Sequence, residues 1–181
     1  GAGYIGLPNI NKPYRGWKLD HFEGGIHVPF AAKWPARIKP GSVFSAPVHH
    51  VDLFKTLAAA GRAQAPTDRV LDGVDLLPFV RGEANGLPHE TLFWREGYHQ
   101  SVLHGGWKLI RAEQPDKPAG TPQKKWLFNL SVDPTEQHNL AEQNPARVAA
   151  LEALLAAHNA EQVAPMWPSV VQDAQLIDKP G

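Results

Sequence analysis

The feature that most constrains this chain of 181 residues is a pair of adjacent glycines, Gly105 and Gly106, between two strand-like segments. Residues 100–104 and 107–111 each have the length and composition of a β-strand. A two-residue hairpin turn requires positive φ angles, which glycine adopts without strain. We therefore expect an antiparallel hairpin here.

Two further segments extend this hairpin into a small sheet. Residues 91–95 (TLFWR) and 125–130 (KWLFNL) have the composition of strands. Further on, Asn144 is a favourable N-cap, and Pro145 suits the first position of a helix. That helix carries one stripe of side chains, formed by Val148, Leu151, Leu155 and His158. The pattern predicts a small α+β domain of about four antiparallel strands with one packed helix.

The N-terminal half is organised differently, with long irregular connections around two predicted elements. Residues 26–34 form a short apolar run and are predicted to be a strand. Residues 51–60 are predicted to form a helix with one apolar face. Gly61 is expected to end that helix in the left-handed conformation.

The polar stretch 83–89 (EANGLPH) is the expected domain boundary. It gives a predicted first domain at residues 1–86 and a second at residues 87–181. Residues 1–25 are rich in Gly, Pro and Asn and follow no period of 2 or 3.6. We expect them to be an extended loop, held by whatever protein it lies against.

Two adjacent histidines precede the predicted helix. His49 and His50 point in divergent directions, and no HxH or HExxH spacing accompanies them, so we interpret them as polar residues near the helix start. Asp52 is interpreted in the same way, because a carboxylate is favourable near a helix N-terminus.

A basic turn within residues 11–34 is the candidate for chemistry. Gly16, Gly24 and Gly25 allow the backbone to pass close to a ligand. Lys18, among these glycines, is a plausible point charge for an anion. From residue types alone, however, a solvent-facing lysine is the favoured interpretation.

The same turn resembles the signature of a known family. Residues 13–18 (PYRGWK) and 23–29 (EGGIHVP) are similar to the P-L-R-G-x-K…E-G-G-I-R-V-P signature of type I sulfatases, which belong to the alkaline-phosphatase-like superfamily. Later segments resemble that family in the same order, at residues 34–35, 51–57, 71–78, 107–110, 127–130, 133–136 and 139–141. The resemblance implies the C-terminal part of an α/β sulfatase domain, followed by the small α+β domain.

The resemblance also implies roles for residues of the turn. Lys18 corresponds to the lysine that contacts the substrate sulfate and the formylglycine hydroxyl, so it is the candidate catalytic residue. Arg15 and His27 are candidate substrate-binding residues, although the family more often has Arg at the position of His27. Arg15 could instead pair with a carboxylate such as Glu23 and hold the loop. The expected structural residues of the loop are Glu23, Gly24 and Gly25.

The family's nucleophile is a formylglycine made from the Cys or Ser of a C/S-x-P/A-x-R segment, and its metal, calcium, is bound by Asp and Asn side chains. This chain has no Cys, and no Ser opens that pattern. We therefore predict that the nucleophile and the Ca²⁺ ligands precede Gly1 in a longer sulfatase. None of the 181 residues is assigned to the metal, and the chain alone is predicted to be inactive.

The charge balance and the apolar runs of the sequence indicate which classes of partner are expected. Lys plus Arg equals Asp plus Glu at 18 each, so no overall field favours a nucleic acid. No apolar run approaches the roughly 20 residues of a membrane span. The expected partner is a sulfate-ester small molecule or a sulfated glycan.

Two alternatives stay open for the function, a non-catalytic binding or assembly module and a phosphate- or phosphonate-ester hydrolase of the same superfamily. Such sulfatases are often periplasmic, extracellular or lysosomal, and the sequence does not choose among these compartments.

Overall fold

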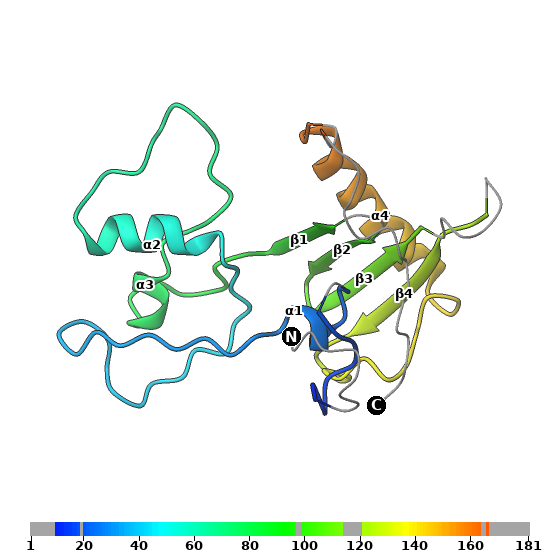
Figure 1. Cartoon of the computed structure of the whole chain (residues 1–181), viewed down its shortest axis with the longest axis horizontal. Coiled ribbons are helices and arrows are strands. Elements are labelled where there is room, and N and C mark those ends of the chain that lie inside the picture. The colour runs from blue at the N-terminus through cyan, green and yellow to red at the C-terminus, as the bar shows by residue number, and fades with distance from the viewer. Residues whose placement is uncertain (1–9, 19, 97–98, 114–120, 164–165, 167–181) are drawn as a thin grey trace. The chain divides into compact units, whose positions relative to one another are not determined.

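The structure is a computed structural model that describes residues 10–18, 20–96, 99–113, 121–163 and 166 (Figure 1). The first nine residues of the expected N-terminal loop lie outside this range. The chain forms two compact units, which we call unit 1 (residues 1–29 with 91–181) and unit 2 (residues 30–90). The first 29 residues thus group with the C-terminal part of the chain, and a domain spanning residues 1–86 stays a prediction. No helix in the described residues is long and apolar enough to cross a membrane.

Unit 1 is built on a four-stranded antiparallel sheet with the strand order β1-β2-β3-β4. The strands are β1 (Thr91–Glu96), β2 (His99–His104), β3 (Trp107–Ala112) and β4 (Lys124–Asn129). They agree with the predicted strands to within one residue at each end. The small antiparallel sheet predicted from the sequence is therefore confirmed.

The β2–β3 hairpin has the predicted turn. Gly105 and Gly106 both have positive φ angles, of 55° and 78°. Positive φ at both central residues is the geometry of a type I′ turn, whose twist matches that of the flanking strands. The turn sets the register, because His104 pairs with Trp107 and Val102 with Leu109.

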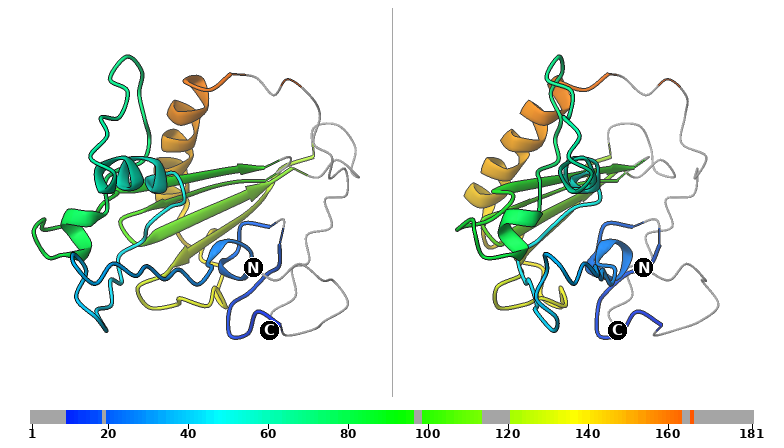
Figure 2. Two further views of the ribbon diagram at one scale, coloured as in Figure 1. Left: turned by 60° about the vertical axis from the view of Figure 1, so that its left-hand side comes forward. Right: turned by 90° about the vertical axis from the view of Figure 1, so that its left-hand side faces the viewer.

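One face of the sheet is covered by helix α4 (Pro145–Ala160) (Figure 2). Asn144 precedes the helix as predicted, but its side chain donates a hydrogen bond to the Leu140 carbonyl and makes no cap. The stripe is confirmed: its first three members are buried, and the ring of the fourth, His158, stacks on Phe93 at 4.1 Å. This core consists of Val102, Leu109, Leu127, Val148, Leu151 and Leu155.

The opposite face is covered by the N-terminal segment, as both views of Figure 2 show for α1 (Glu23–Ile26). Phe22 is fully buried there in a second core with Ile110, Ala112, Trp126 and Phe128. The described residues 20–25 of the expected N-terminal loop are thus held by the sheet of this chain itself. Side chains alternate between the two faces of a strand, so this face was available to a second layer.

The predicted strand at residues 26–34 is not formed. Residues 23–26 make one helical turn, in which Ile26 N–H bonds to the Phe22 carbonyl, and residues 27–34 are irregular. Val28 and Phe30 are more than half exposed. An apolar run becomes a strand only when another strand accepts its backbone hydrogen bonds, and none of the described strands pairs with it.

Unit 2 contains α2 (Asp52–Ala60) and α3 (Leu77–Val80). The α2 prediction is correct in extent but not in its ending, because Gly61 has φ −80° and the left-handed residue is Arg62, with φ 56°. The carboxylate of Asp52 is fully buried and accepts hydrogen bonds from the backbone N–H groups of His49 and Val74. It thus holds the chain before α2 to the chain before α3.

Candidate functional site

The turn that carries Lys18 is a closed loop. Gly24 N–H donates to the Arg15 carbonyl at 2.6 Å and so joins the two ends of the loop. Inside it, the Asp20 carboxylate accepts hydrogen bonds from the backbone of Trp17 at 2.8 Å and of Phe22 at 3.1 Å. Lys18 lies in this loop with an exposed side chain. The loop therefore presents one lysine to the surface from a backbone that is fixed on both sides.

Gly16, Gly24 and Gly25 are all required by close contact, and a Cβ on Gly25 would lie 2.2 Å from the Asp20 carbonyl oxygen. Gly16 has φ 90°, and a Cβ there would lie 2.5 Å from an Asp20 carboxylate oxygen. A Cβ on Gly24 would lie 2.4 Å from the Gly16 carbonyl oxygen. Side chains at these positions cannot be accommodated without moving the loop, so the glycines are needed for its shape.

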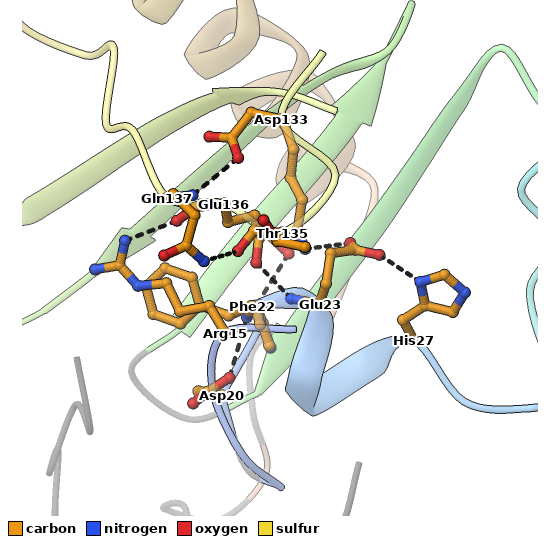
Figure 3. A network of polar contacts seen from close by, with 12 residues as sticks. Arg15, Asp20, Phe22, Glu23, His27, Asp133, Thr135, Glu136 and Gln137 are labelled. Atoms are coloured by element: carbon orange, nitrogen blue, oxygen red, sulfur yellow. Dashed lines mark hydrogen bonds and ion pairs between the residues drawn. The ribbon is translucent and has the colours of Figure 1, made fainter. Parts of the chain in front are cut away.

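Arg15, at the first end of the loop, is buried, and its guanidinium points toward Glu136 (Figure 3). Its guanidinium donates to the Glu136 backbone carbonyl at 2.9 Å and lies 4.6 Å from the centre of the Phe22 ring. Burial lowers the pKa of Arg15, against the attraction of Glu136. The hydrogen bond of Arg15 runs to the backbone of Glu136, and its pairing with a carboxylate such as Glu23 stays a prediction. The interpretation that Arg15 holds the loop agrees with this geometry.

A buried ionic cluster lies next to the second end of the loop. Lys108 Nζ, fully buried on β3, lies 2.6 Å from Glu23 Oε1 and 2.8 Å from Glu136 Oε1. The other oxygen of Glu136 accepts the backbone N–H of Glu23 at 2.6 Å. Glu136 is itself fully buried and has a φ of 60°, a left-handed conformation that is uncommon outside glycine. One glutamate thus contacts both ends of the loop, with its carbonyl on Arg15 and its carboxylate on Glu23.

The two carboxyl groups of this cluster differ in pKa. Burial opposes ionisation of Glu23, but hydrogen bonds from His27 and Lys108 outweigh it and lower the pKa of Glu23 to about 2. For Glu136 burial is not outweighed, and its pKa is raised. Glu23 is therefore the more strongly acidic member of the pair.

The pKa of Asp20 is shifted in the opposite direction to that of Glu23. Burial raises the pKa of Asp20 to about 7, in spite of the two backbone N–H groups that favour its carboxylate. The carboxyl of Glu136 raises it further, and Lys108 opposes the rise. Asp20 therefore changes charge near neutral pH while lying inside the Lys18 loop.

His27 lies at the surface beyond α1. Its Nδ1 is 2.9 Å from Glu23 Oε2, and its ring lies 4.7 Å from that of Tyr14. The hydrogen bond to Glu23 raises the pKa of His27. The structure therefore links His27 to Glu23, and a contact of His27 with substrate stays a prediction.

Sequence reasoning missed Asp20, His21, Lys108 and Glu136 as members of the site. His21 is buried, with Nδ1 3.1 Å from the Ser101 hydroxyl, and burial beside His99 lowers its pKa to about 3. A signal for Lys108 was present, because alternation along β3 puts it on the face opposite Leu109. Glu136 gave no such signal, because it belongs to a turn that no periodicity describes.

A cluster of metal-binding side chains is not found among the described residues. Among the described residues, no group of three or more His, Cys, Asp or Glu side chains is placed to hold a metal ion. His89 Nε2 lies 2.7 Å from Asp52 Oδ1, but that carboxylate also satisfies backbone N–H groups. The described residues do not fit a calcium site, so no chemical step here is assigned to a metal.

Comparison with known proteins gives relatives that are named as sulfatases. No family profile matches the chain. The chain is 33% identical over 199 residues to the steryl-sulfatase of Mus musculus, over 90% of this chain and 32% of that protein. It is 31% identical over 154 residues to the N-acetylgalactosamine-6-O-sulfatase of Bacteroides thetaiotaomicron, over 78% of this chain and 29% of that protein.

The fold has matches among solved structures as well. A 6S-sulfatase structure from a Bacteroides thetaiotaomicron locus for glycosaminoglycan metabolism matches with a TM-score of 0.62 and 30% identity, over 82% of this chain and 32% of that one. The chain spans about a third of the length of the curated relatives given above.

Proposed function

We propose that the Lys18 loop forms part of the active site of a sulfate-ester hydrolase. The premise is that this chain belongs to the sulfatase family, as a C-terminal portion of one of its members. The observation that carries the proposal is the loop itself, which is closed by the Gly24–Arg15 hydrogen bond and leaves Lys18 exposed. A binding module would have no need of a lysine held in this way.

Hydrolysis of a sulfate ester breaks the bond between sulfur and the ester oxygen, and negative charge moves onto the leaving oxygen and the sulfate. A cation held at a fixed place stabilises that charge better than a flexible cation does, because it does not have to reorganise during the reaction. Lys18 can supply this cation, because an ammonium neutralises an anionic oxygen without a rigid geometry. Arg15 is assigned to hold the loop, since it is buried against Phe22 and Glu136.

The remaining groups of such an active site are proposed to lie outside these 181 residues. They are the formylglycine nucleophile and the divalent metal, which the resemblance to type I sulfatases implies to be calcium, an ion that prefers oxygen ligands. The length of the match, about a third of each relative, supports this division. By analogy with relatives named for steroid and amino-sugar substrates, the substrate is proposed to be a sulfate ester of a small molecule or a glycan.

The first test is to sequence the coding DNA upstream of Gly1. An in-frame C/S-x-P/A-x-R segment is the expected result, and a stop codon followed directly by a start codon would favour a free-standing binding module. The longer protein should then hydrolyse 4-nitrophenyl sulfate, and Lys18→Ala should reduce kcat/KM about 100-fold or more, as loss of one charge-stabilising group does. Lys39→Ala, at an exposed lysine of unit 2, is the matched control.

The same assay separates the alternative within the superfamily. A longer protein that hydrolyses 4-nitrophenyl phosphate or a phosphonate monoester faster than the sulfate ester would be a phosphoryl-transfer enzyme. Equal activity of wild type and Lys18→Ala on every ester would show that the loop has no catalytic role.

A further inference from the structure

We propose that Lys108 and Glu136 are positioning residues for Lys18, and that they act by clamping the two ends of the loop that carries it. This inference rests on the proposed function of Lys18 and deepens it. It assigns a role to two buried residues that contact no substrate themselves.

The clamp is visible in the contacts of Glu136 (Figure 3). Its backbone carbonyl accepts the Arg15 guanidinium, and its carboxylate accepts the Glu23 backbone N–H. Arg15 and Glu23 stand on either side of Lys18 in sequence, at the beginning and end of the loop. One residue of the C-terminal part of unit 1 therefore fixes both ends of a loop that lies more than a hundred residues earlier.

The clamp depends on Lys108. Two carboxyl groups that face each other in a buried site repel when both are ionised, and a shared cation removes this repulsion. Lys108 Nζ lies within 2.8 Å of an oxygen of each, Glu23 and Glu136. It comes from β3, between buried Leu109 on one side and the hairpin turn on the other, so its backbone is held by the sheet. Loss of Lys108 would therefore loosen Glu23 and Glu136 together.

Other restraints also act on the loop. The Gly24–Arg15 hydrogen bond and the Asp20 carboxylate lie within it, and His21 Nδ1, 3.1 Å from the Ser101 hydroxyl, links its middle to β2. Phe22 attaches it to the second core by apolar contact, which fixes position less sharply than directional hydrogen bonds do. The orientation of Lys18 should thus depend on Glu136, and a displacement of about 1 Å in a catalytic group can cost about 100-fold in rate.

The first arm of the test uses the chain itself and requires no activity. Trypsin cleavage after Lys18 should accelerate about 10-fold in Glu136→Gln and in Lys108→Met, because the loop opens more often. Cleavage after Arg147, on α4, reports on the opening of the sheet and should change far less. Lys125→Met, which removes a surface ion pair with Glu152 at 2.7 Å, is the matched control and should leave both rates unchanged.

The second arm uses the longer sulfatase polypeptide. Lys108→Met should lower kcat/KM about 10- to 100-fold in the wild-type background. In a Lys18→Ala background, Lys108→Met should lower kcat/KM by less than about 3-fold, because a residue that acts through Lys18 has no lysine left to position. Lys108→Arg, which keeps the charge, should recover part of the loss.

The outcomes are distinguishable. Unchanged cleavage after Lys18 in both Glu136→Gln and Lys108→Met would overturn the clamp, whatever the activity. Equal losses of kcat/KM with and without Lys18 would overturn the positioning role. A further outcome is that the longer protein hydrolyses no sulfate ester while cleavage after Lys18 still accelerates. That result would overturn the sulfatase proposal, and with it the positioning of a catalytic lysine. The clamp on the loop would stand. Parallel acceleration after Lys18 and Arg147 would mean that the residues serve only overall folding.

Discussion

At the scale of single residues, Asp20 is the group of the loop most sensitive to pH near neutrality. Its two hydrogen bonds from backbone N–H groups fit a carboxylate, yet burial raises its pKa to about 7. The folded chain therefore binds a proton at Asp20 over a range in which the unfolded chain, with a pKa near 3.8, has released it. A carboxyl with a raised pKa contributes stability at low pH that is lost as the pH rises.

Replacing Asp20 by Asn removes this dependence. As the pH rises from about 4 to about 7, we expect wild type to lose stability relative to Asp20→Asn. The loss in unfolding free energy should be at most about 1.4 kcal/mol per pH unit. Urea unfolding followed by tryptophan fluorescence at several pH values measures this difference. A difference that is constant with pH would mean that Asp20 titrates normally in the folded chain.

Glu23 should behave in the opposite direction in a more acidic range. Its pKa is lowered from 4.5 to about 2, so its ionised form stabilises the folded chain above about pH 4.5, and the contribution disappears as the pH falls towards 2. The advantage of wild type over Glu23→Gln should be up to about 3 kcal/mol above pH 5 and should vanish near pH 2. Acid unfolding curves of the two proteins test this, and an advantage that grows in acid would contradict it.

At the scale of elements, the β2–β3 hairpin depends on the conformation of its two turn residues. A Cβ on Gly105 would meet no atom within 4 Å, whereas a Cβ on Gly106 would lie 2.7 Å from the Ser131 hydroxyl. Both residues have positive φ angles, which cost most residues about 1–2 kcal/mol but suit Asn.

These differences make Gly105 and Gly106 unequal in their response to mutation. Gly105→Asn should change the free energy of unfolding by less than about 0.5 kcal/mol, since Asn-Gly is a favoured type I′ pair. Gly106→Ala should destabilise by about 1–2 kcal/mol. Thermal unfolding of the two variants beside wild type measures both, and equal stability of the variants would show that the turn does not require left-handed geometry at Gly106.

The elements that could be predicted from the sequence are those specified by neighbours along the chain. Gly105 and Gly106 specify a turn, and Pro145 starts a helix whose apolar stripe follows from its period. The segment 26–34 could not be predicted in this way, because a strand depends on a partner elsewhere. The same holds for the site: Lys18 could be proposed from its motif, but no local pattern links Glu23 to Lys108, 85 residues away.

At the scale of the whole molecule, the proposed active site takes Lys18 from this chain and its nucleophile and metal ligands from residues outside it. We therefore expect the 181-residue chain to hydrolyse no aryl sulfate, because Lys18 can stabilise charge but cannot replace a nucleophile. Prolonged incubation of purified chain with 4-nitrophenyl sulfate, beside Lys18→Ala, measures this. Turnover by wild type above that of Lys18→Ala would show that these residues contain a complete active site.

The dependence of the Lys18 loop on Glu136 also has a consequence during synthesis. Arg15 and Glu23 precede Glu136 by 121 and 113 residues. At about 5–20 residues per second, a ribosome reaches Glu136 roughly 6 to 24 s after Arg15. For that interval the nascent loop exists without its clamp, and the intervening residues 30–90 of unit 2 can fold before it closes. The segment that is proposed to meet the substrate is thus translated well before the residue that fixes its two ends.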